Sequence, residues 1–259
     1  LEKLGVECVE LFCSPTGNFP HNPEPLPENL IEISKKVVDT KADLGIVVDP
    51  DVDRLALVCE DGSMFGEEYT LVSVADYVLS KTPGNTVSNL SSTRALSDVT
   101  NKHNGNYFAS AVGEVNVVEK MKDKNAVIGG EGNGGIIYPA LHYGRDALVG
   151  IALFLTNLAE KEISCKSLRK TYPNYFISKN KIDLDLSVDI AKLLKTLESK
   201  FSFNNINTID GLKINFDDGW VHLRRSNTEP IIRIYSESVT LDKANQLAED
   251  FISQIKELL

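Results

Sequence analysis

LGIVVDPDVDRLALVC, residues 44–59, places three aspartates between two apolar runs. Each run has the length and composition of a buried strand, so Asp49, Asp51 and Asp53 are predicted to lie on the loop that joins two strands. Carboxylates at alternate positions of one loop can turn several oxygens toward one point, as a hard divalent cation such as Mg²⁺ or Ca²⁺ requires. Arg54 follows directly and would hold a fixed positive charge beside that cation, where an anionic group could meet both.

Two other interpretations compete for this acidic loop. A solvated acidic turn would show the same three aspartates. A calcium loop of the EF-hand kind has acids at positions 1, 3 and 5 and a Glu at position 12, which is Glu60 when Asp49 is counted first. That loop requires Gly at position 6, where this chain has Arg54, and it requires flanking helices where the flanks here are strand-like. The calcium loop is therefore disfavoured, and the acidic turn stays open.

The composition limits the possible partners. The chain has 259 residues and a formal net charge of −10, with 37 acids against 27 Lys and Arg. A nucleic-acid or anionic-membrane surface would be basic, so we expect neither partner, and an anionic ligand would need a local basic cluster. The four cysteines lack metal-site spacing, which predicts reduced thiols and a cytoplasmic protein. The chain starts with Leu1 in a strand-like run, which indicates a fragment of a longer protein.

Strand-like and helix-like segments alternate over the first two thirds of the chain, which predicts layered, mixed or parallel α/β domains. The predicted strands are residues 6–13, 44–48, 55–59, 86–90, 107–112, 125–129 and 136–138. The predicted helices are residues 27–42, 69–81, 95–103, 114–122 and 146–163, and the proline-dense residues 14–27 before them predict a long loop.

The last third of the chain predicts a different layout. Its strand-like segments are residues 175–184, 206–216, 219–223 and 231–235, and its helix-like segments are residues 188–201 and 241–258. An antiparallel sheet covered by two helices, an α+β domain, fits this order. We therefore expect three domains, which comprise residues 1–65, 66–173 and 174–259.

RRSNTEPIIR, residues 224–233, is the main concentration of positive charge in this acidic chain. Guanidinium groups, hydroxyls, a side-chain amide and loop N–H groups complement the oxygens of a phosphate. A hairpin loop with surface arginines is the alternative, and Arg233 on the following strand could face solvent. The candidate phosphate ligands are Arg224, Ser226, Asn227, Thr228 and Arg233.

GGEGNGG, residues 129–135, is a glycine-dense segment that could be mistaken for a dinucleotide-binding fingerprint. That fingerprint must open a helix, whereas a strand-like segment at residues 136–138 follows here, so we reject it. Glu131 offers a carboxylate acceptor, and Asn133 offers an amide with donors and an acceptor, both of which suit ligand hydroxyls. A plain glycine-rich turn is the alternative.

The joint occurrence and order of DPDVDR, GEGNGG and RRSNTEPIIR resembles the α-D-phosphohexomutase superfamily, which includes phosphoglucomutase/phosphomannomutase and phosphoglucosamine mutase. The resemblance covers the chain from FPHNPEP, residues 19–25, onward, and it implies the end of the family's second domain followed by its third and fourth domains. Family members interconvert hexose 1-phosphates and 6-phosphates through a phosphoserine and a bisphosphate intermediate. No segment here matches the phosphoserine loop, so we expect a chain that is inactive without the missing N-terminal domains.

The resemblance also implies residue roles. Asp49, Asp51 and Asp53 would bind Mg²⁺, and Arg54 would be the catalytic residue that contacts the transferring phosphoryl group. Positioning and electrostatics would supply most of the catalysis. The substrate's other phosphate would be bound by Arg224, Ser226, Asn227, Thr228 and Arg233.

Glu131 and Asn133 would bind sugar hydroxyls of the hexose phosphate. Many family members read GExSGH in this loop, with a histidine where this chain has Gly135, which leaves the general acid or base open. The GExNGG form more closely resembles the phosphoglucosamine mutase-like branch, but the choice of hexose stays open. A non-catalytic module that binds sugar phosphate or metal is the alternative to an enzyme.

Overall fold

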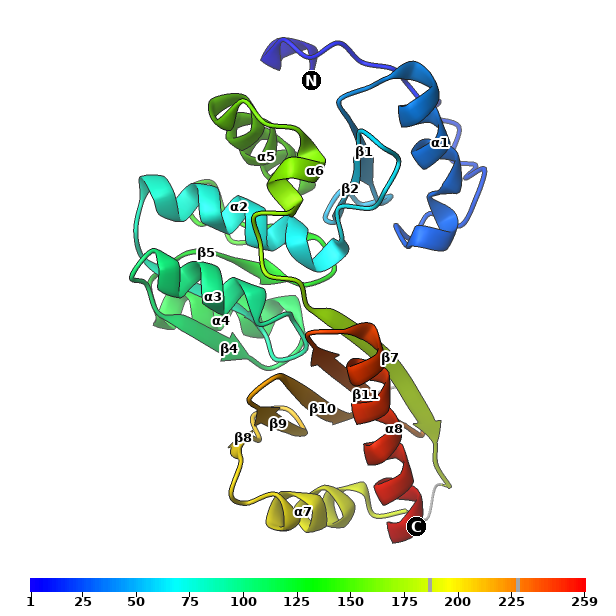
Figure 1. The fold of residues 1–259 in the computed structure, drawn as a ribbon, viewed down its shortest axis with the longest axis vertical. Coiled ribbons are helices and arrows are strands. Elements are labelled where there is room, and N and C mark those ends of the chain that lie inside the picture. The colour runs from blue at the N-terminus through cyan, green and yellow to red at the C-terminus, as the bar shows by residue number, and fades with distance from the viewer. Residues whose placement is uncertain (186–187, 227–228) are drawn as a thin grey trace. The chain divides into compact units, whose positions relative to one another are not determined.

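The computed structural model describes residues 1–185, 188–226 and 229–259. These residues form two compact units (Figure 1). Unit 1 contains Leu1–Asn89, Ala95–Ala109 and Gly113–Tyr172, and unit 2 contains Leu90–Arg94, Ser110–Val112 and Pro173–Leu259. Within the described part of the chain, no helix has both the length and the apolar character needed to cross a membrane.

The first two strands of unit 1, β1 (Leu44–Val48) and β2 (Leu55–Cys59), form a two-stranded antiparallel ribbon. The helix α1 (Ile31–Thr40) packs against both strands, as Figure 1 shows. Two short 3₁₀ helices precede α1, η1 (Glu2–Leu4) and η2 (Pro27–Asn29).

The strand predicted at residues 6–13 is wrong. These residues form no strand and are mostly exposed, and β2 is the only neighbour of β1 among the described residues. An extended segment becomes a strand only where another strand accepts and donates its backbone hydrogen bonds. Local alternation of apolar and polar residues cannot show whether such a partner exists.

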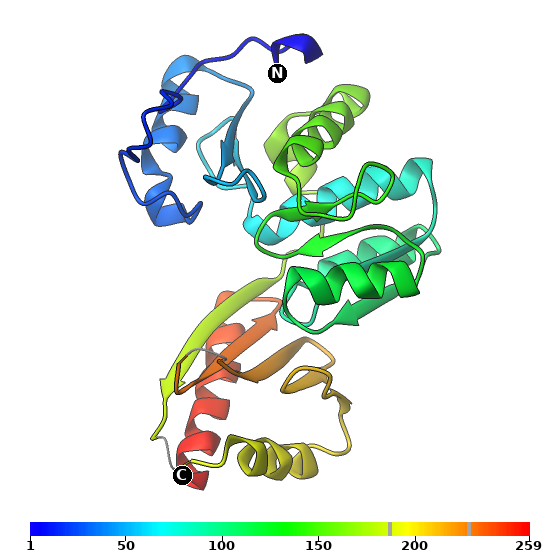
Figure 2. The same cartoon turned by 180° about the vertical axis from the view of Figure 1, so that it is seen from behind.

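The main sheet of unit 1 has the strand order β4-β3-β5-β6, with β3 and β5 parallel and β5 and β6 antiparallel. The helices α2 and α3 lie on one face of the sheet and α4 on the other, as the two opposite views show (Figures 1 and 2). This confirms the mixed, layered α/β prediction. The elements are β3 (Asn85–Asn89), β4 (Tyr107–Ser110), β5 (Ala126–Glu131), β6 (Gly135–Ile137), α2 (Glu67–Lys81), α3 (Ala95–Lys102), α4 (Glu114–Asp123), α5 (Ala147–Lys161) and α6 (Cys165–Arg169).

Unit 2 is an antiparallel sheet in the order β7-β11-β10-β9-β8, accompanied by two helices, which confirms the α+β prediction. One strand predicted at residues 206–216 is instead two strands separated by a turn at Gly211, whose φ is 74°. The elements are β7 (Phe176–Asp183), α7 (Ile190–Lys200), β8 (Asn205–Asn207), β9 (Leu212–Phe216), β10 (Gly219–Arg225), β11 (Ile231–Ser238) and α8 (Leu241–Leu258).

The two faces of the unit 2 sheet differ in chemistry because strand side chains alternate between faces. The face toward the helices is apolar and includes Val221, Leu223, Ile232 and Ile234, which pack with Phe251 of α8. The residues between them in sequence therefore point to the opposite face. The basic residues on that face include Lys179, Lys181, Lys213, Arg224 and Arg233.

Candidate active site

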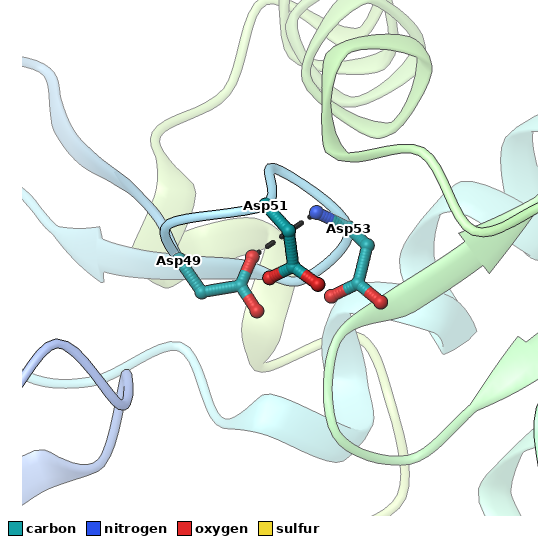
Figure 3. Close-up of side chains that lie close together, drawn as sticks. All are labelled: Asp49, Asp51 and Asp53. Atoms are coloured by element: carbon teal, nitrogen blue, oxygen red, sulfur yellow. Dashed lines mark hydrogen bonds between the residues drawn. The ribbon is translucent and has the colours of Figure 1, made fainter.

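The three aspartates of the DPDVDR loop gather at the end of β1 (Figure 3). One carboxylate oxygen from each of Asp49, Asp51 and Asp53 lies within 4.8 Å of the others. Asp49 Oδ1 accepts hydrogen bonds from the backbone N–H groups of Asp53 (3.0 Å) and Arg54 (2.9 Å). Burial alone would raise the pKa of Asp49, but these bonds and the Arg54 charge hold that pKa below its ordinary value. Asp49 therefore stays ionised near neutral pH and supports the loop that carries the other two acids.

The oxygen atoms of this cluster fit a hard divalent cation. Asp53 Oδ1 is buried and accepts no hydrogen bond from any residue that the structure describes. Burial and the adjacent Asp49 side chain raise the pKa of Asp53, although the positive charge of Arg145 opposes them. An all-oxygen donor set is typical of Mg²⁺ and Ca²⁺ sites. Asp49 is only 3% exposed, which does not suit a freely solvated acidic turn.

The backbone of the loop is held in an uncommon conformation. Val52 has a φ of 58°, a region that a β-branched residue rarely adopts. Its N–H donates to the carbonyl of Asp49 (3.0 Å), and its own carbonyl accepts from the N–H of Ala147 at the start of α5 (3.1 Å). These two bonds keep the turn tight, so that the carboxylates on either side of Val52 converge.

Arg54 stands beside the acids and remains partly accessible. Its Nε donates to Asp49 Oδ2 (2.9 Å) and lies 3.6 Å from Asp53 Oδ1, while Nη1 lies 3.7 Å from Glu24 Oε1. Glu24 belongs to the proline-dense segment, which together with α1 and β1 lines a cavity of about 380 Å³ that reaches Asp49. The guanidinium is therefore oriented by carboxylates while 31% of its side chain stays exposed, which leaves room for an anionic ligand.

The GGEGNGG segment forms a tight hairpin against the acidic loop. Its first three residues end β5, and Gly135 begins β6. Arg54 pairs with Gly135 as an antiparallel bridge, and the N–H of Leu55 donates to the carbonyl of Gly134 (3.1 Å). Gly134 has a φ of 87°, and a Cβ there would lie 2.3 Å from the Leu55 carbonyl oxygen, so this close approach requires glycine. Two motifs about 80 residues apart in sequence thus lie side by side in unit 1.

The predicted sugar ligands have different surroundings. Glu131 is 6% exposed, and its Oε1 accepts from Asn89 Nδ2 (2.8 Å) and from the N–H of Gly113 (3.3 Å). Its Oε2 accepts from Arg145 Nη1 (2.9 Å). Asn133 Oδ1 accepts from the N–H of Gly135 (3.2 Å), which uses the amide oxygen to close the hairpin. Glu131 is thus fixed by partners, whereas no described residue accepts a hydrogen bond from the Asn133 NH₂ group.

Sequence reasoning missed Arg145. Its guanidinium donates to Asp53 Oδ2 and to Glu131 Oε2, and its Nε lies 3.4 Å from Glu114 Oε2. The backbone N–H of Arg145 also donates to Glu114 Oε1 (3.0 Å). This residue joins the acidic loop to the glycine-rich hairpin. No local signal marks it, because it is a single arginine just before α5.

The candidate phosphate ligands lie in unit 2. Arg224 of β10 is directly opposite Arg233 of β11, which in turn is directly opposite Lys181 of β7. These three residues form a row of cations on the face of the sheet away from the helices. Like charges placed directly opposite destabilise a sheet, so the row favours a bound anion. Lys181 was missed because a lysine on an exposed strand is usually only a solvated side chain.

The loop between these strands is described in part. Ser226 is 5% exposed, and its N–H donates to the carbonyl of Ile231 (3.0 Å). Two acids form long ion pairs with the row, Asp210 with Arg224 (3.7 Å) and Glu229 with Arg233 (3.9 Å). Asn227 and Thr228, which were also predicted to bind phosphate, lie outside the described residues. The described part places Arg224, Ser226 and Arg233 around one end of the β10–β11 hairpin.

Comparison with known families agrees with these observations. Three models of the phosphoglucomutase/phosphomannomutase family match consecutive parts of the chain: α/β/α domain II at residues 1–62, α/β/α domain III at residues 66–175 and the C-terminal domain at residues 180–254. The chain belongs to the α-D-phosphohexomutase superfamily. This superfamily member has the expected mixed α/β and α+β architecture.

Individual relatives show how much of a family chain is present. A probable phosphoglucosamine mutase of Methanopyrus kandleri is 32% identical over 99% of this chain, and a phosphoglucomutase/phosphomannomutase of Thermococcus kodakarensis is 35% identical over 100% of it. The chain spans 57% of the length of each of these relatives. The crystal structure of a phosphoglucomutase/phosphomannomutase family protein from Burkholderia thailandensis matches 99% of this chain and 56% of its own, with a TM-score of 0.85 and 29% identity.

Proposed function

We propose that the chain supplies the metal-binding, sugar-binding and phosphate-binding parts of a phosphohexomutase, an enzyme that interconverts hexose 1-phosphates and 6-phosphates. The observation that carries this proposal is the direct pairing of the acidic loop with the glycine-rich hairpin through Arg54 and Gly135. The pairing brings the candidate metal ligands and the candidate sugar ligand Glu131 into one cluster, where Arg145 contacts both sets. Membership of the phosphoglucomutase/phosphomannomutase family supports this proposal at the level of the enzyme class.

In this proposal, Asp49, Asp51 and Asp53 hold Mg²⁺, which when bound neutralises negative charge on a transferring phosphoryl group. Arg54 contacts that phosphoryl group with the donors that its carboxylate partners leave free. Its orientation by Asp49 means that little side-chain freedom remains to be lost on binding.

The remaining ligands hold the rest of the substrate. Glu131 and Asn133 bind sugar hydroxyls. The phosphate that does not react is bound in unit 2 by Arg224, Ser226 and Arg233, with Asn227 and Thr228 in the adjoining segment. Binding energy from a phosphate that does not react can be used to orient the reacting end of a substrate.

The hexose is proposed at the level of a class. The Methanopyrus kandleri relative is named for phosphoglucosamine and the Thermococcus kodakarensis relative for phosphoglucose and phosphomannose, at similar identity. Glucosamine 6-phosphate, glucose 6-phosphate and mannose 6-phosphate are therefore the candidate substrates. Differences in affinity among them would assign the branch.

The test is calorimetric titration of the chain with each sugar phosphate in the presence of Mg²⁺. Arg224→Ala is expected to weaken binding at least tenfold, because a charge-assisted bond to phosphate is lost. Arg225→Ala is the matched control, since Arg225 is opposite Ile232 and therefore on the other face of the same strand. Saturable binding that Arg224→Ala removes and Arg225→Ala retains supports the proposal. Equal effects of both variants, or no binding by the wild-type chain, contradict it.

We further propose that the 259-residue chain alone does not interconvert hexose phosphates, because no segment in it matches the family's phosphoserine loop. A coupled assay of the purified chain from a host that lacks its own mutase should give no product above background. Turnover by the chain alone would overturn this part of the proposal while leaving its ligand-binding part intact. A full-length protein that binds hexose phosphates but does not interconvert them would instead favour the non-catalytic module.

A further inference from the structure

Gly135 makes room for the side chain of Arg145. A Cβ at residue 135 would lie 2.5 Å from Arg145 Cδ and 3.2 Å from Arg145 Cγ. The backbone of Gly135 does not itself require glycine, because its φ is not positive and it pairs as an ordinary strand residue of β6. Among the described residues, the other close atom is Asn133 Oδ1 at 3.1 Å, the end of a flexible side chain. The requirement for glycine at position 135 therefore comes from Arg145.

The guanidinium that passes over Gly135 is surrounded by acids from three separate segments. Asp53 comes from the loop after β1, Glu131 from the end of β5 and Glu114 from the start of α4. The Arg145 side chain is 18% exposed, and those of Asp53 and Glu131 are 16% and 8% exposed. Carboxylates this close and this buried repel one another unless a cation lies between them. Arg145 provides that cation and also fixes direction, because the donors of a guanidinium have a rigid geometry.

We propose that Arg145 is a positioning residue, which fixes the carboxylates of Asp53 and Glu131 relative to each other, and that Gly135 is the position that admits it. This inference rests on the proposed function, in which Asp53 is a metal ligand and Glu131 a sugar ligand. Many superfamily members have a histidine at the position of Gly135. In this chain the space above that position is filled by a side chain from ten residues further along the sequence. A larger residue at position 135 would therefore require the Arg145 side chain to move from its observed position.

A double-mutant cycle tests the packing part of the proposal. Gly135→Ala in the wild-type chain should lower the melting temperature of unit 1 by roughly 2–6 °C, because the new methyl group overlaps the Arg145 stem. The same change in an Arg145→Ala background should shift the melting temperature by less than about 1 °C, because the obstruction is gone. Unit 1 is followed by scanning calorimetry, since the single tryptophan, Trp220, lies in unit 2. Equal shifts in both backgrounds would overturn the proposal.

Sugar-phosphate binding tests the functional part. Arg145→Ala is expected to weaken binding of glucosamine 6-phosphate with Mg²⁺ about tenfold or more, because Glu131 and Asp53 lose a charged partner. Arg145→Lys should recover part of that loss, since it restores the charge but not the paired donors. The double variant Gly135→Ala/Arg145→Ala should melt near Arg145→Ala and bind as weakly as Arg145→Ala, because the methyl group at position 135 no longer meets the Arg145 side chain.

The outcomes separate this inference from the proposed function. A wild-type chain that binds none of the three hexose phosphates refutes the proposed function, and with it the role of Arg145 toward the sugar. Normal wild-type binding that Arg145→Ala leaves unchanged refutes the role of Arg145 alone. If Arg145→Ala does not fold, Arg145→Lys supplies the same comparison. If Arg145→Lys binds glucosamine 6-phosphate as tightly as the wild type does, the paired donors of the guanidinium are not needed and the proposal is refuted.

Discussion

His222 should make the stability of unit 2 depend on pH. The ring lies on β10 and is 2% exposed. Its Nε2 is 2.6 Å from the carbonyl oxygen of Asp210, and its Nδ1 is 2.9 Å from Ser91 Oγ. Because a carbonyl only accepts, the proton of the neutral ring belongs on Nε2, and Nδ1 accepts from the Ser91 hydroxyl. A second proton on Nδ1 would remove that acceptor and place a charge in the interior.

The size of the effect follows from the pKa of His222. Burial lowers it from 6.5 to about 4, and the nearby Lys213 charge acts in the same direction, although the bond to Asp210 opposes them. The unfolded chain therefore takes up a proton between pH 6.5 and pH 4 that the folded chain does not. Stability that is fully present above pH 6.5 is lost as the pH falls through this window, in total about 3 kcal/mol.

Urea unfolding followed by the fluorescence of Trp220 measures this loss directly, because Trp220 is the single tryptophan and lies in unit 2. The comparison is between the wild-type chain and His222→Gln from pH 8 to pH 4. Burial raises the pKa of Glu237, whose contribution to stability falls as the pH rises, but Glu237 is present in both proteins. The free-energy difference between the two proteins should therefore shrink by about 3 kcal/mol on acidification. Identical pH slopes would refute the assignment of a buried, neutral ring.

Three further predictions concern other parts of the chain. Gly134→Ala should destabilise unit 1 by roughly 3 kcal/mol, because it places a side chain at positive φ and against the Leu55 carbonyl. Gly17 has a similar φ but open space around it, so Gly17→Ala should cost only about 1 kcal/mol. Equal costs of the two variants in calorimetry would contradict the clash. Without phosphate, Arg233→Leu should leave unit 2 equally stable or a few tenths of a kcal/mol more stable, because it relieves repulsion between the like charges of the row. Phosphate at constant ionic strength should raise the melting temperature of the wild type but not that of Arg233→Leu. A thiol reagent should label the exposed Cys8 and Cys13 quickly in the native chain. It should label the buried Cys59 and Cys165 only when the chain unfolds. Rapid labelling of all four cysteines would show that the interface of β2 and α6 opens freely.

The architecture was largely predictable because the strands and helices of both units carry their own hydrophobic periodicity. The acidic loop between two apolar runs and the alternation of segments after it gave the correct fold class. The failures arose where a local pattern needed information from elsewhere. Residues 6–13 alternate like a strand but pair with no strand in the part of the chain that the structure describes. Residues 206–216 are broken at Gly211, where a Cβ would lie 2.2 Å from the Leu223 carbonyl oxygen.

The candidate site was predictable only where one short segment supplies several ligands. One tight turn gathers Asp49, Asp51 and Asp53, so a short motif contains the whole candidate metal cluster. The same holds for the basic and hydroxyl residues of the β10–β11 hairpin. Lys181 joins the basic row only through strand pairing, so no motif contains it. Motifs therefore reveal candidate ligands more readily than the residues that contact those candidates from elsewhere in the sequence.

Gly135 shows why the positioning residues need the structure. In the sequence it is only a departure from GExSGH, a position where a histidine is lost and nothing is gained. In the structure the missing side chain is the condition for Arg145 to reach Asp53 and Glu131. The reason for glycine at position 135 therefore lies ten residues away, at a position with no motif of its own. Replacing Gly135 with histidine should therefore restore nothing unless Arg145 is shortened as well.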